Sequence, residues 1–276
     1  MTASMRGGAT MQIYQEDLLS AWRDRLQLES DLRQAVTDRA FGIHYQPQVD
    51  VETGRIVGLE ALLRWPHPVH GFVSPAEFVP VAEQLGLIRK LGSWVLEAAV
   101  ADFIEWDRAS LAPRELAVNV SAFQMRDMTL VTRLGEVLER TGLEPARLVL
   151  EITETAAIAQ NERIEQCLEG MRGLGVTLAV DDFGTGYANL SLLNNLDFRK
   201  LKLDRSLLPV CSEDRSTRLF TNVVAMAKEL GLELVAEGVE TPAELAAVYK
   251  AGCRVVQGYF YSPPVNSEKL GSLLLN

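Results

Sequence analysis

Seven apolar, strand-like segments of the chain each carry a carboxylate, a carboxamide or an amine at or near their C-terminal end. In chain order these side chains are Glu60, Asn119, Glu151, Asp181 with Asp182, Lys202, Glu237 and Gln257. A carboxylate among leucines and valines is costly to bury unless it is paired or bound to a metal ion. Several carboxylates with one amide match the oxygen ligands that Mg²⁺ or Mn²⁺ prefer. The pattern therefore predicts one metal-dependent site assembled from many strands.

The elements that must position these side chains alternate between strand and helix. Helical segments follow the strand-like runs at residues 74–106, 130–142, 164–175, 216–231 and 241–252. Ser74 and Thr241 are expected N-caps, each before a proline, and Gly142 is an expected C-cap. Such βα alternation predicts a parallel sheet covered by helices, and polar strand ends favour an α/β barrel with its site at the C-terminal face of the strands.

The first part of the chain departs from this alternation. Residues 12–40 have helical periodicity and predict one or two helices ahead of the barrel. Residues 41–50 and 54–65 are both strand-like and are separated by a short turn, so we expect them to pair as a hairpin.

Composition restricts the class of protein. The chain has 276 residues, of which 47% are hydrophobic and 23% charged, as in an ordinary globular domain, and a net charge of −10 argues against a general nucleic-acid binder. No apolar run is long enough for a membrane span, and the first residues lack the apolar core of a secretory signal. The three cysteines show no metal-binding spacing. We therefore expect a cytoplasmic location and no membrane span.

Several of the polar residues have simpler alternative interpretations. Asp181 and Asp182 repel each other unless cations hold them, but they are also compatible with a capping pair at a turn. Asn119 is either a neutral metal ligand or a partner for loop backbone groups. Lys202 shares a strand face with Asp204, so it either faces the ring of acids or forms a salt bridge with Asp204.

Three further residues that do not lie at strand ends also have two possible interpretations. Arg64 suits a bidentate phosphate contact, with a surface salt bridge as the alternative. His67 and His70 are three positions apart, but their proline-containing loop favours a structural interpretation over a metal site.

Eight motifs together resemble the EAL domain family, the bacterial phosphodiesterases of cyclic di-GMP. They are, in family order, YQPQVD, EALLRW, NVSAFQ, LEITET, DDFGTGYANL, LKLDRS, AEGVET and QGYFYSPP, and they cover residues 30–270. The resemblance implies a modified TIM (β/α)8 barrel whose first strand is antiparallel to the others. It also implies two Mg²⁺ or Mn²⁺ ions per site, inhibition by Ca²⁺, and hydrolysis of cyclic di-GMP to linear pGpG.

The resemblance implies a role for each matching residue. Those expected at the metals are Glu60, Asn119, Glu151, Asp181, Asp182 and Glu237, of which Glu60 and Glu237 are also counted as catalytic together with the water-orienting Lys202. Those expected at the substrate are Gln46, Leu62, Arg64, Asp204, Gln257 and Tyr187. Those expected to support the loop after Asp182 are Glu154, Glu240, Gly184 and Gly186. Ala188 and Asn189 depart from the family, which usually has two serines there.

The resemblance also bears on organisation and partners. It predicts lead-in residues 1–11, a linker helix at 12–30 and the phosphodiesterase domain at 31–276. A homodimer is expected, with an upstream diguanylate cyclase (GGDEF) or sensor domain in a longer protein. Two other functions stay open at this stage. One is a catalytically silent receptor for cyclic di-GMP, and the other is a different metal-dependent barrel enzyme of the enolase type.

Overall fold

The computed structural model describes residues 25–158, 162–185, 198–209 and 215–275. These residues form two compact units. The barrel unit comprises residues 42–63 and those from 91 onward, and the first unit comprises residues 25–41 and 64–90. The predicted lead-in at residues 1–11 and most of the predicted linker helix lie outside the described residues, so these two boundaries stay predictions.

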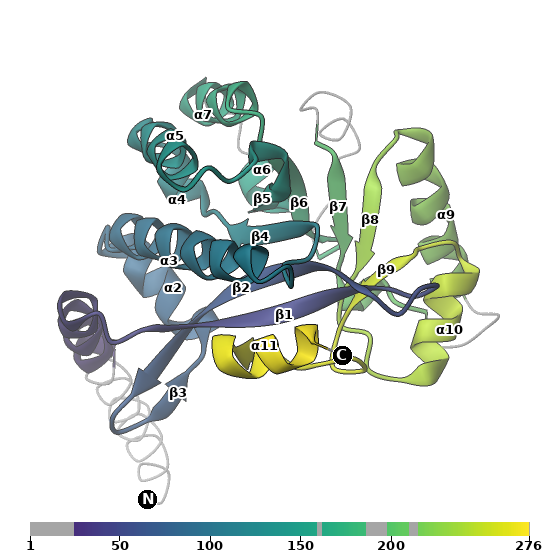
Figure 1. Ribbon diagram of the computed structural model, residues 1–276, viewed down its shortest axis with the longest axis horizontal. Coiled ribbons are helices and arrows are strands. Elements are labelled where there is room, and N and C mark those ends of the chain that lie inside the picture. The colour runs from purple at the N-terminus through teal and green to yellow at the C-terminus, as the bar shows by residue number, and fades with distance from the viewer. Residues whose placement is uncertain (1–24, 159–161, 186–197, 210–214, 276) are drawn as a thin grey trace, which may run out of the picture. The chain divides into compact units, whose positions relative to one another are not determined.

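Eight strands close into a barrel within the described part of the barrel unit (Figure 1). Their order around the barrel is β1, β9, β8, β7, β6, β5, β4 and β2, and a β1–β2 pairing closes it. β1 is antiparallel to β9, whereas the neighbouring pairs from β2 through β9 are parallel. The strands are β1 (Gly42–Asp50), β2 (Ile56–His67), β4 (Glu115–Asn119), β5 (Leu148–Thr153), β6 (Thr177–Phe183), β7 (Lys200–Leu203), β8 (Glu233–Ala236) and β9 (Val255–Gln257).

The predicted fold class is therefore confirmed, including the antiparallel first strand. The hairpin of β1 and β2 explains that strand direction. Its turn is closed by a backbone hydrogen bond from the Asp50 N–H to the Arg55 carbonyl at 3.0 Å. A connection this short can join only antiparallel strands, whereas the parallel strands that follow need crossovers.

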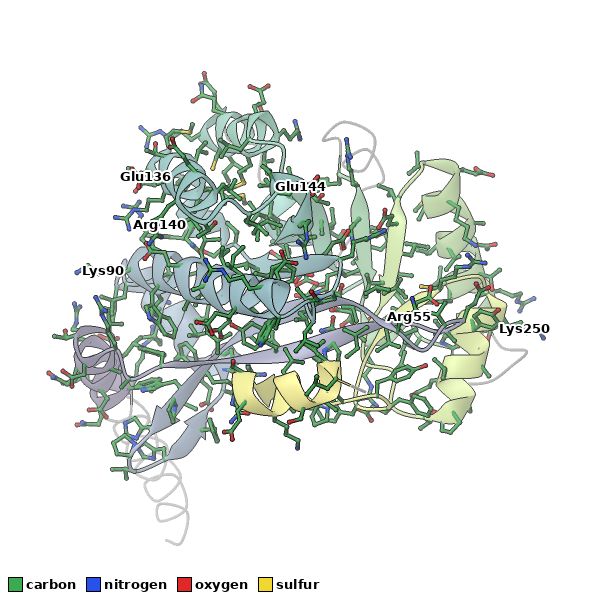
Figure 2. All side chains as sticks on the ribbon, in the orientation of Figure 1. Arg55, Lys90, Glu136, Arg140, Glu144 and Lys250 are labelled. Carbon is green, nitrogen blue, oxygen red and sulfur yellow. The ribbon has the colours of Figure 1, made fainter. Side chains whose placement is uncertain are left out.

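Helices connect the parallel strands and cover them. α5 packs beside α7, α9 packs against β8, and the C-terminal α11 lies on β1, as Figure 1 shows. The charged side chains of Glu136 and Arg140 on α5 are exposed (Figure 2), and Arg140 lies 3.9 Å from Glu97 of α3. The described α-helices of this unit are α3 (Ile88–Arg108, of which the residues from 91 onward belong to this unit), α4 (Ala122–Met125), α5 (Thr129–Thr141), α6 (Glu154–Ile158), α7 (Glu162–Gly173), α9 (Arg215–Glu229), α10 (Pro242–Lys250) and α11 (Ser267–Leu274).

The expected helix caps are present, and one expected helix is divided. Thr241 forms a capping box with Glu244 before α10, and Gly142 ends α5 in the left-handed region at φ +69°. Ser74 accepts a hydrogen bond from the Ala76 N–H. The single helix predicted over residues 74–106 is wrong, because Gly86 adopts φ +68° and separates α2 (Pro75–Gln84) from α3.

Two apolar clusters lie on the two faces of the barrel strands. The large cluster packs one face of each strand against the helices and includes Leu116, Leu150 and Leu178. A separate small cluster contains Ala117 of β4, Val149 of β5 and Ala179 of β6. Side chains alternate between the two faces of a strand, so this second cluster lies inside the barrel. Its small residues leave room for longer side chains farther along the same strands.

A charged network joins the beginnings of three barrel strands. Glu115, Lys200 and Glu233 are the first residues of β4, β7 and β8. The buried Lys200 ammonium pairs with Glu115 and lies 3.4 Å from Glu233. Arg114 bonds to both acids, at 2.8 Å to Glu115 and 2.7 Å to Glu233. The network thus compensates the charges at the end of the barrel opposite to the strand C-termini.

The first unit contains a helix at residues 25–38, the end of β2 with β3 (Gly71–Val73), and α2. Its centre is aromatic, since Phe41, Trp65 and Phe78 have ring centroids 5.6–6.0 Å apart. His67 accepts the Val69 and His70 N–H groups with its Nδ1 and places its Nε2 3.3 Å from Asp31. Both ring nitrogens are therefore occupied, which supports the structural interpretation of this histidine.

No helix among the described residues has both the length and the apolar character needed to cross a bilayer.

Candidate active site

The polar side chains at the strand ends gather at the C-terminal mouth of the barrel. Asn119, Glu151 and Asp181 each stand two positions after a member of the small inner cluster, so they share its inward face. Oxygen atoms of Glu60, Glu151 and Asp181 all lie within 4.8 Å of one another, as do those of Asp181, Asp182 and Glu237. The structure thus brings all six predicted metal-binding side chains to one region, since Asn119 bonds to Glu60.

Lys202 of β7 lies at the centre of this group. Its Nζ is 2.8 Å from Glu151, 2.8 Å from Glu237, 3.0 Å from Asp181 and 3.2 Å from Glu60. The lysine is only 1% exposed. Asp204, the alternative partner, instead caps the short helix η2 (Arg205–Leu207) by accepting the Ser206 N–H at 2.8 Å. Of the two interpretations of Lys202, the structure supports the one in which it faces the acids.

One ammonium group cannot balance four carboxylates in a buried site. Burial opposes the charge of Lys202, but Asp181, Glu151, Glu237 and Glu60 raise its pKa well above the ordinary value. Burial, followed by the charge of Glu60, raises the pKa of Glu151 well above its ordinary value. Burial raises the pKa of Glu237 to about 8, against the opposing effect of Lys202. The protein alone therefore leaves an excess of negative charge that favours cations.

An irregularity in β6 lets two neighbouring acids face the same region. In a regular strand, successive side chains point to opposite faces. The register of β6 against β7 shifts between Val180 and Phe183, and Asp182 adopts a left-handed φ of +56°. The Asp182 N–H donates to Asp181 Oδ1 at 3.0 Å. The bulge thereby places Asp181 and Asp182 within reach of a common ion, and burial followed by Asp181 raises the pKa of Asp182.

Two amides hold the Glu60 carboxylate. Asn119 Nδ2 donates to Glu60 Oε1 at 2.7 Å, and Gln257 Nε2 donates to Glu60 Oε2 at 2.5 Å. Burial alone would raise the pKa of Glu60, but Lys202, Gln257 and Asn119 together lower it. Because Asn119 uses its amino group on Glu60, its amide oxygen is left to act as a neutral ligand.

The donor set fits divalent metal ions of the hard type. Its potential ligand atoms are carboxylate oxygens and one amide oxygen, with no thiolate, which matches Mg²⁺ or Mn²⁺ better than softer metals. The two groups of acids share Asp181, so one carboxylate belongs to both. Each of the two groups could hold a metal ion.

The predicted loop-support residues make contacts around the end of β6. The buried Glu154, first residue of α6, accepts the Gly184 N–H with its Oε2 at 3.3 Å. Gly184 has φ +106°, and a Cβ there would lie 2.4 Å from Leu207. Glu240 accepts hydrogen bonds from both terminal nitrogens of Arg205, and the bond from Nη2 is 2.7 Å long. Gly186 lies outside the described residues.

The residues predicted to contact the substrate differ in their burial and in the unit to which they belong. Gln46 is buried on β1 and bonds to Gln257 and to the Ser262 carbonyl. Leu62 is half-buried on β2. Arg64 follows it on the same strand but belongs to the first unit. Tyr187 lies outside the described residues.

Sequence reasoning did not single out two residues that contact the site. Gln48 donates to Gln257 Oε1 at 3.1 Å, and Arg205 holds Glu240. Gln48 could have been found, because it stands two positions after Gln46 and so shares its strand face. Arg205 offered no such signal, since its partner is distant in the sequence.

The fold and site together define a (β/α)8-type barrel with an acidic centre suited to divalent metal ions at its C-terminal mouth. A family model described as the EAL domain matches residues 29–264. The chain belongs to the EAL domain family.

Two relatives from Pseudomonas aeruginosa are much longer than this chain. The bifunctional diguanylate cyclase/cyclic di-GMP phosphodiesterase MucR is 39% identical over 249 residues, which are 90% of this chain and 36% of MucR. The cyclic di-GMP phosphodiesterase NbdA is 38% identical over 269 residues, which are 97% of this chain and 34% of NbdA. The chain thus spans about a third of the length of these curated relatives.

A solved structure of the MucR phosphodiesterase in complex with c-di-GMP superimposes on this chain. Its TM-score is 0.83 and its sequence identity 40%, and the match covers 88% of this chain and 99% of that structure. Two relatives of this chain are thus named as cyclic di-GMP phosphodiesterases, and the MucR domain, which has the same fold, has a solved structure in complex with c-di-GMP.

Proposed function

We propose that this chain is a metal-dependent phosphodiesterase that hydrolyses cyclic di-GMP to linear pGpG. The observation that carries the proposal is the buried Lys202 ammonium surrounded by Glu60, Glu151, Asp181 and Glu237. The relatives named as cyclic di-GMP phosphodiesterases and the c-di-GMP complex of MucR support the choice of substrate.

We assign the metal-binding side chains to two positions. Glu60, Asn119, Glu151 and Asp181 would hold one Mg²⁺ or Mn²⁺ ion, and Asp181, Asp182 and Glu237 would hold the second. When bound, such a pair of ions stabilises negative charge on the phosphodiester and lowers the pKa of the attacking water. The carboxyl groups of this chain fix where the ions bind, and the bulge in β6 supplies two of them from adjacent positions.

We assign the movement of the proton to Glu237 and the orientation of the water to Lys202. Glu237 follows β8 and is only partly buried, so its carboxylate can meet a water molecule at the mouth. Lys202 is fixed by four acids and cannot turn away, which suits a group that must hold a water molecule in one orientation. Its positive charge also favours charge developing on the phosphoryl oxygens.

The substrate contacts in this proposal come from Gln46, Leu62, Arg64, Asp204, Gln257 and Tyr187. Glu154, Glu240, Gly184 and Gly186 support the loop that follows Asp182. The contact of Glu154 with the Gly184 N–H supports that assignment, because it ties α6 to the first residue after β6.

The wider organisation is also proposed. We place the phosphodiesterase domain at residues 31–276 behind a linker helix, as part of a longer signalling protein that forms a homodimer and carries an upstream cyclase or sensor domain. The greater length of MucR and NbdA supports the part of this proposal that places the chain in a longer protein. We place the protein in the cytoplasm, since Cys167 and Cys253 are free thiols.

The proposed function is tested by incubating the purified chain with cyclic di-GMP and Mg²⁺ and separating the products by chromatography. We expect pGpG with Mg²⁺ or Mn²⁺, and none with EDTA or Ca²⁺. Glu60→Gln and Lys202→Met should abolish product, whereas Lys250→Met, which removes an exposed lysine of α10, should not. Tight nucleotide binding without any pGpG would favour the silent receptor, and hydrolysis by Glu60→Gln at the rate of the unaltered chain would contradict the assigned site.

A further inference from the structure

Three buried glutamines form a continuous row beside the acidic cluster. Gln46 and Gln48 lie on β1, and Gln257 ends the neighbouring β9, directly opposite Gln48 in the strand register. All three are nearly inaccessible to solvent, at 7%, 4% and 4% exposure in that order. Gln48 Nε2 donates to Gln257 Oε1 at 3.1 Å, and Gln257 Nε2 donates both to Gln46 Oε1 at 3.1 Å and to Glu60 Oε2 at 2.5 Å.

The direction of these hydrogen bonds is determined by chemistry. An ionised carboxylate only accepts hydrogen bonds, so Gln257 must turn its amino group toward Glu60. Its carbonyl oxygen then points the other way and needs a donor, which Gln48 supplies. At the other end, Gln46 donates to the Ser262 carbonyl at 3.2 Å, which is also an obligatory acceptor. Each amide therefore has one orientation that satisfies all its partners.

Gly58 provides the space that Gln48 occupies. It lies on β2 two residues before Glu60, so the two residues share one face of the strand. A Cβ atom at Gly58 would lie 2.6 Å from Gln48 Oε1. Any larger residue at this position would push the Gln48 amide away from Gln257.

We propose that Gln48, seated over Gly58, is a positioning residue that fixes the amide of Gln257 and through it the carboxylate of Glu60. This inference rests on the proposed function, because it takes Glu60 as a metal ligand. With its two oxygens held by Asn119 and Gln257, the Glu60 carboxylate is kept in one orientation before an ion arrives. Without the donor at Gln48, the Gln257 carbonyl oxygen loses its hydrogen bond in a buried place, so the amide that donates to Glu60 is held less firmly.

Such outer partners of a metal ligand commonly change metal affinity by about 10-fold to 100-fold when they are replaced. We therefore expect Gln48→Met, which keeps the length of the side chain but removes the donor, to weaken Mn²⁺ binding by about 10-fold or more. Gly58→Ala should have a similar effect while leaving every polar group in place. The double variant should bind about as weakly as either single variant, since both changes disrupt one arrangement.

The experiment uses the full chain without nucleotide. Mn²⁺ affinity is measured by isothermal titration, and the unfolding midpoint is measured in EDTA. Thr177→Val is the matched control, because it removes another buried hydrogen bond, from Thr177 Oγ1 to the Ala146 carbonyl, at the far end of β6. We expect this control to lower the unfolding midpoint about as much as Gln48→Met while leaving Mn²⁺ affinity unchanged.

Three results would contradict the inference. They are unchanged Mn²⁺ affinity in Gln48→Met, unchanged affinity in Gly58→Ala, or full additivity of the two changes. Glu60→Gln separates this failure from failure of the proposed function. If Glu60→Gln loses Mn²⁺ affinity and Gln48→Met does not, only the role of Gln48 is wrong. If Glu60→Gln binds Mn²⁺ as tightly as the unaltered chain, the metal site itself is wrong.

Discussion

Replacing Lys202 with methionine should destabilise the metal-free protein strongly and the metal-loaded protein much less. The substitution keeps the volume of the side chain but removes the one ammonium group that contacts Glu60, Glu151, Asp181 and Glu237. Removing one partner of a buried ion pair typically costs about 3–5 kcal/mol, because it leaves uncompensated charge. Proton uptake by the carboxyl groups with raised pKa values limits the loss, so we do not expect the costs of four separate pairs to add.

That loss corresponds to a decrease of roughly 6–20 °C in the unfolding midpoint, at about 2–4 °C per kcal/mol for a domain of this order of size. The assay is thermal unfolding followed by circular dichroism, in EDTA and in excess Mg²⁺ at equal ionic strength. Bound cations replace part of the missing positive charge, so the difference between variant and unaltered protein should shrink in Mg²⁺. Lys250→Met is the control, because Lys250 is exposed at the end of α10 (Figure 2).

Equal midpoints for Lys202→Met and the unaltered protein in EDTA would refute the reasoning. They would mean that the four carboxylates do not depend on this lysine for charge compensation. A large decrease that Mg²⁺ leaves unchanged would show instead that the lysine matters for packing, and that the acids do not bind the ion in its absence.

Other predictions follow from the same structure. Because the pKa of Glu237 is raised from 4.5 to about 8 on folding, its contribution to the stability of the metal-free protein is lost as pH rises between those values. The gain in unfolding midpoint from adding Mg²⁺ should therefore widen from pH 5 to pH 8, and a constant gain would contradict this. Lys200→Met should lower the free energy of unfolding by about 3 kcal/mol by leaving Glu115 without its buried partner, with Mn²⁺ affinity unchanged in titration. Cys167 and Cys253 are fully buried with thiol pKa values raised by burial to about 11 and about 12, so mapping by mass spectrometry should find neither labelled by a thiol reagent until the protein unfolds.

Much of the fold could be predicted because its signals are local. Ser74, Gly142 and Thr241 mark helix ends by their own chemistry, and the apolar runs ending in Glu151 or Asp181 indicate strands that meet at one mouth. Gly86 was harder, because the residues on both sides of it continue a helical pattern. Gly86 adopts the left-handed backbone conformation that divides the expected helix. A glycine allows this conformation, but its presence in the sequence does not require it.

The site was predicted as a set of residues, but not as a set of contacts. The pairing of Lys202 with four acids, and not with the nearby Asp204, depends on strand register around a closed barrel, which no local pattern contains. The same holds for Arg205 and Glu240, whose contact brings together residues 35 positions apart. Alternation along β1 puts Gln48 on the same strand face as Gln46, but a single amide indicates no chemistry until its partners are known.

The irregular register of β6 makes the length of this segment matter more than its composition. Asp181 and Asp182 face one region only because an extra residue is accommodated between Val180 and Phe183. Asp181 and Asp182 are the two residues in that interval, so removing one of them would restore the regular register and leave a single acid where the structure has two. Conservative substitutions around the pair should be tolerated in evolution or in a mutational library, whereas one-residue insertions and deletions should be eliminated. The spacing from strand to loop is thus a sharper criterion than sequence identity for recognising chains that keep this site.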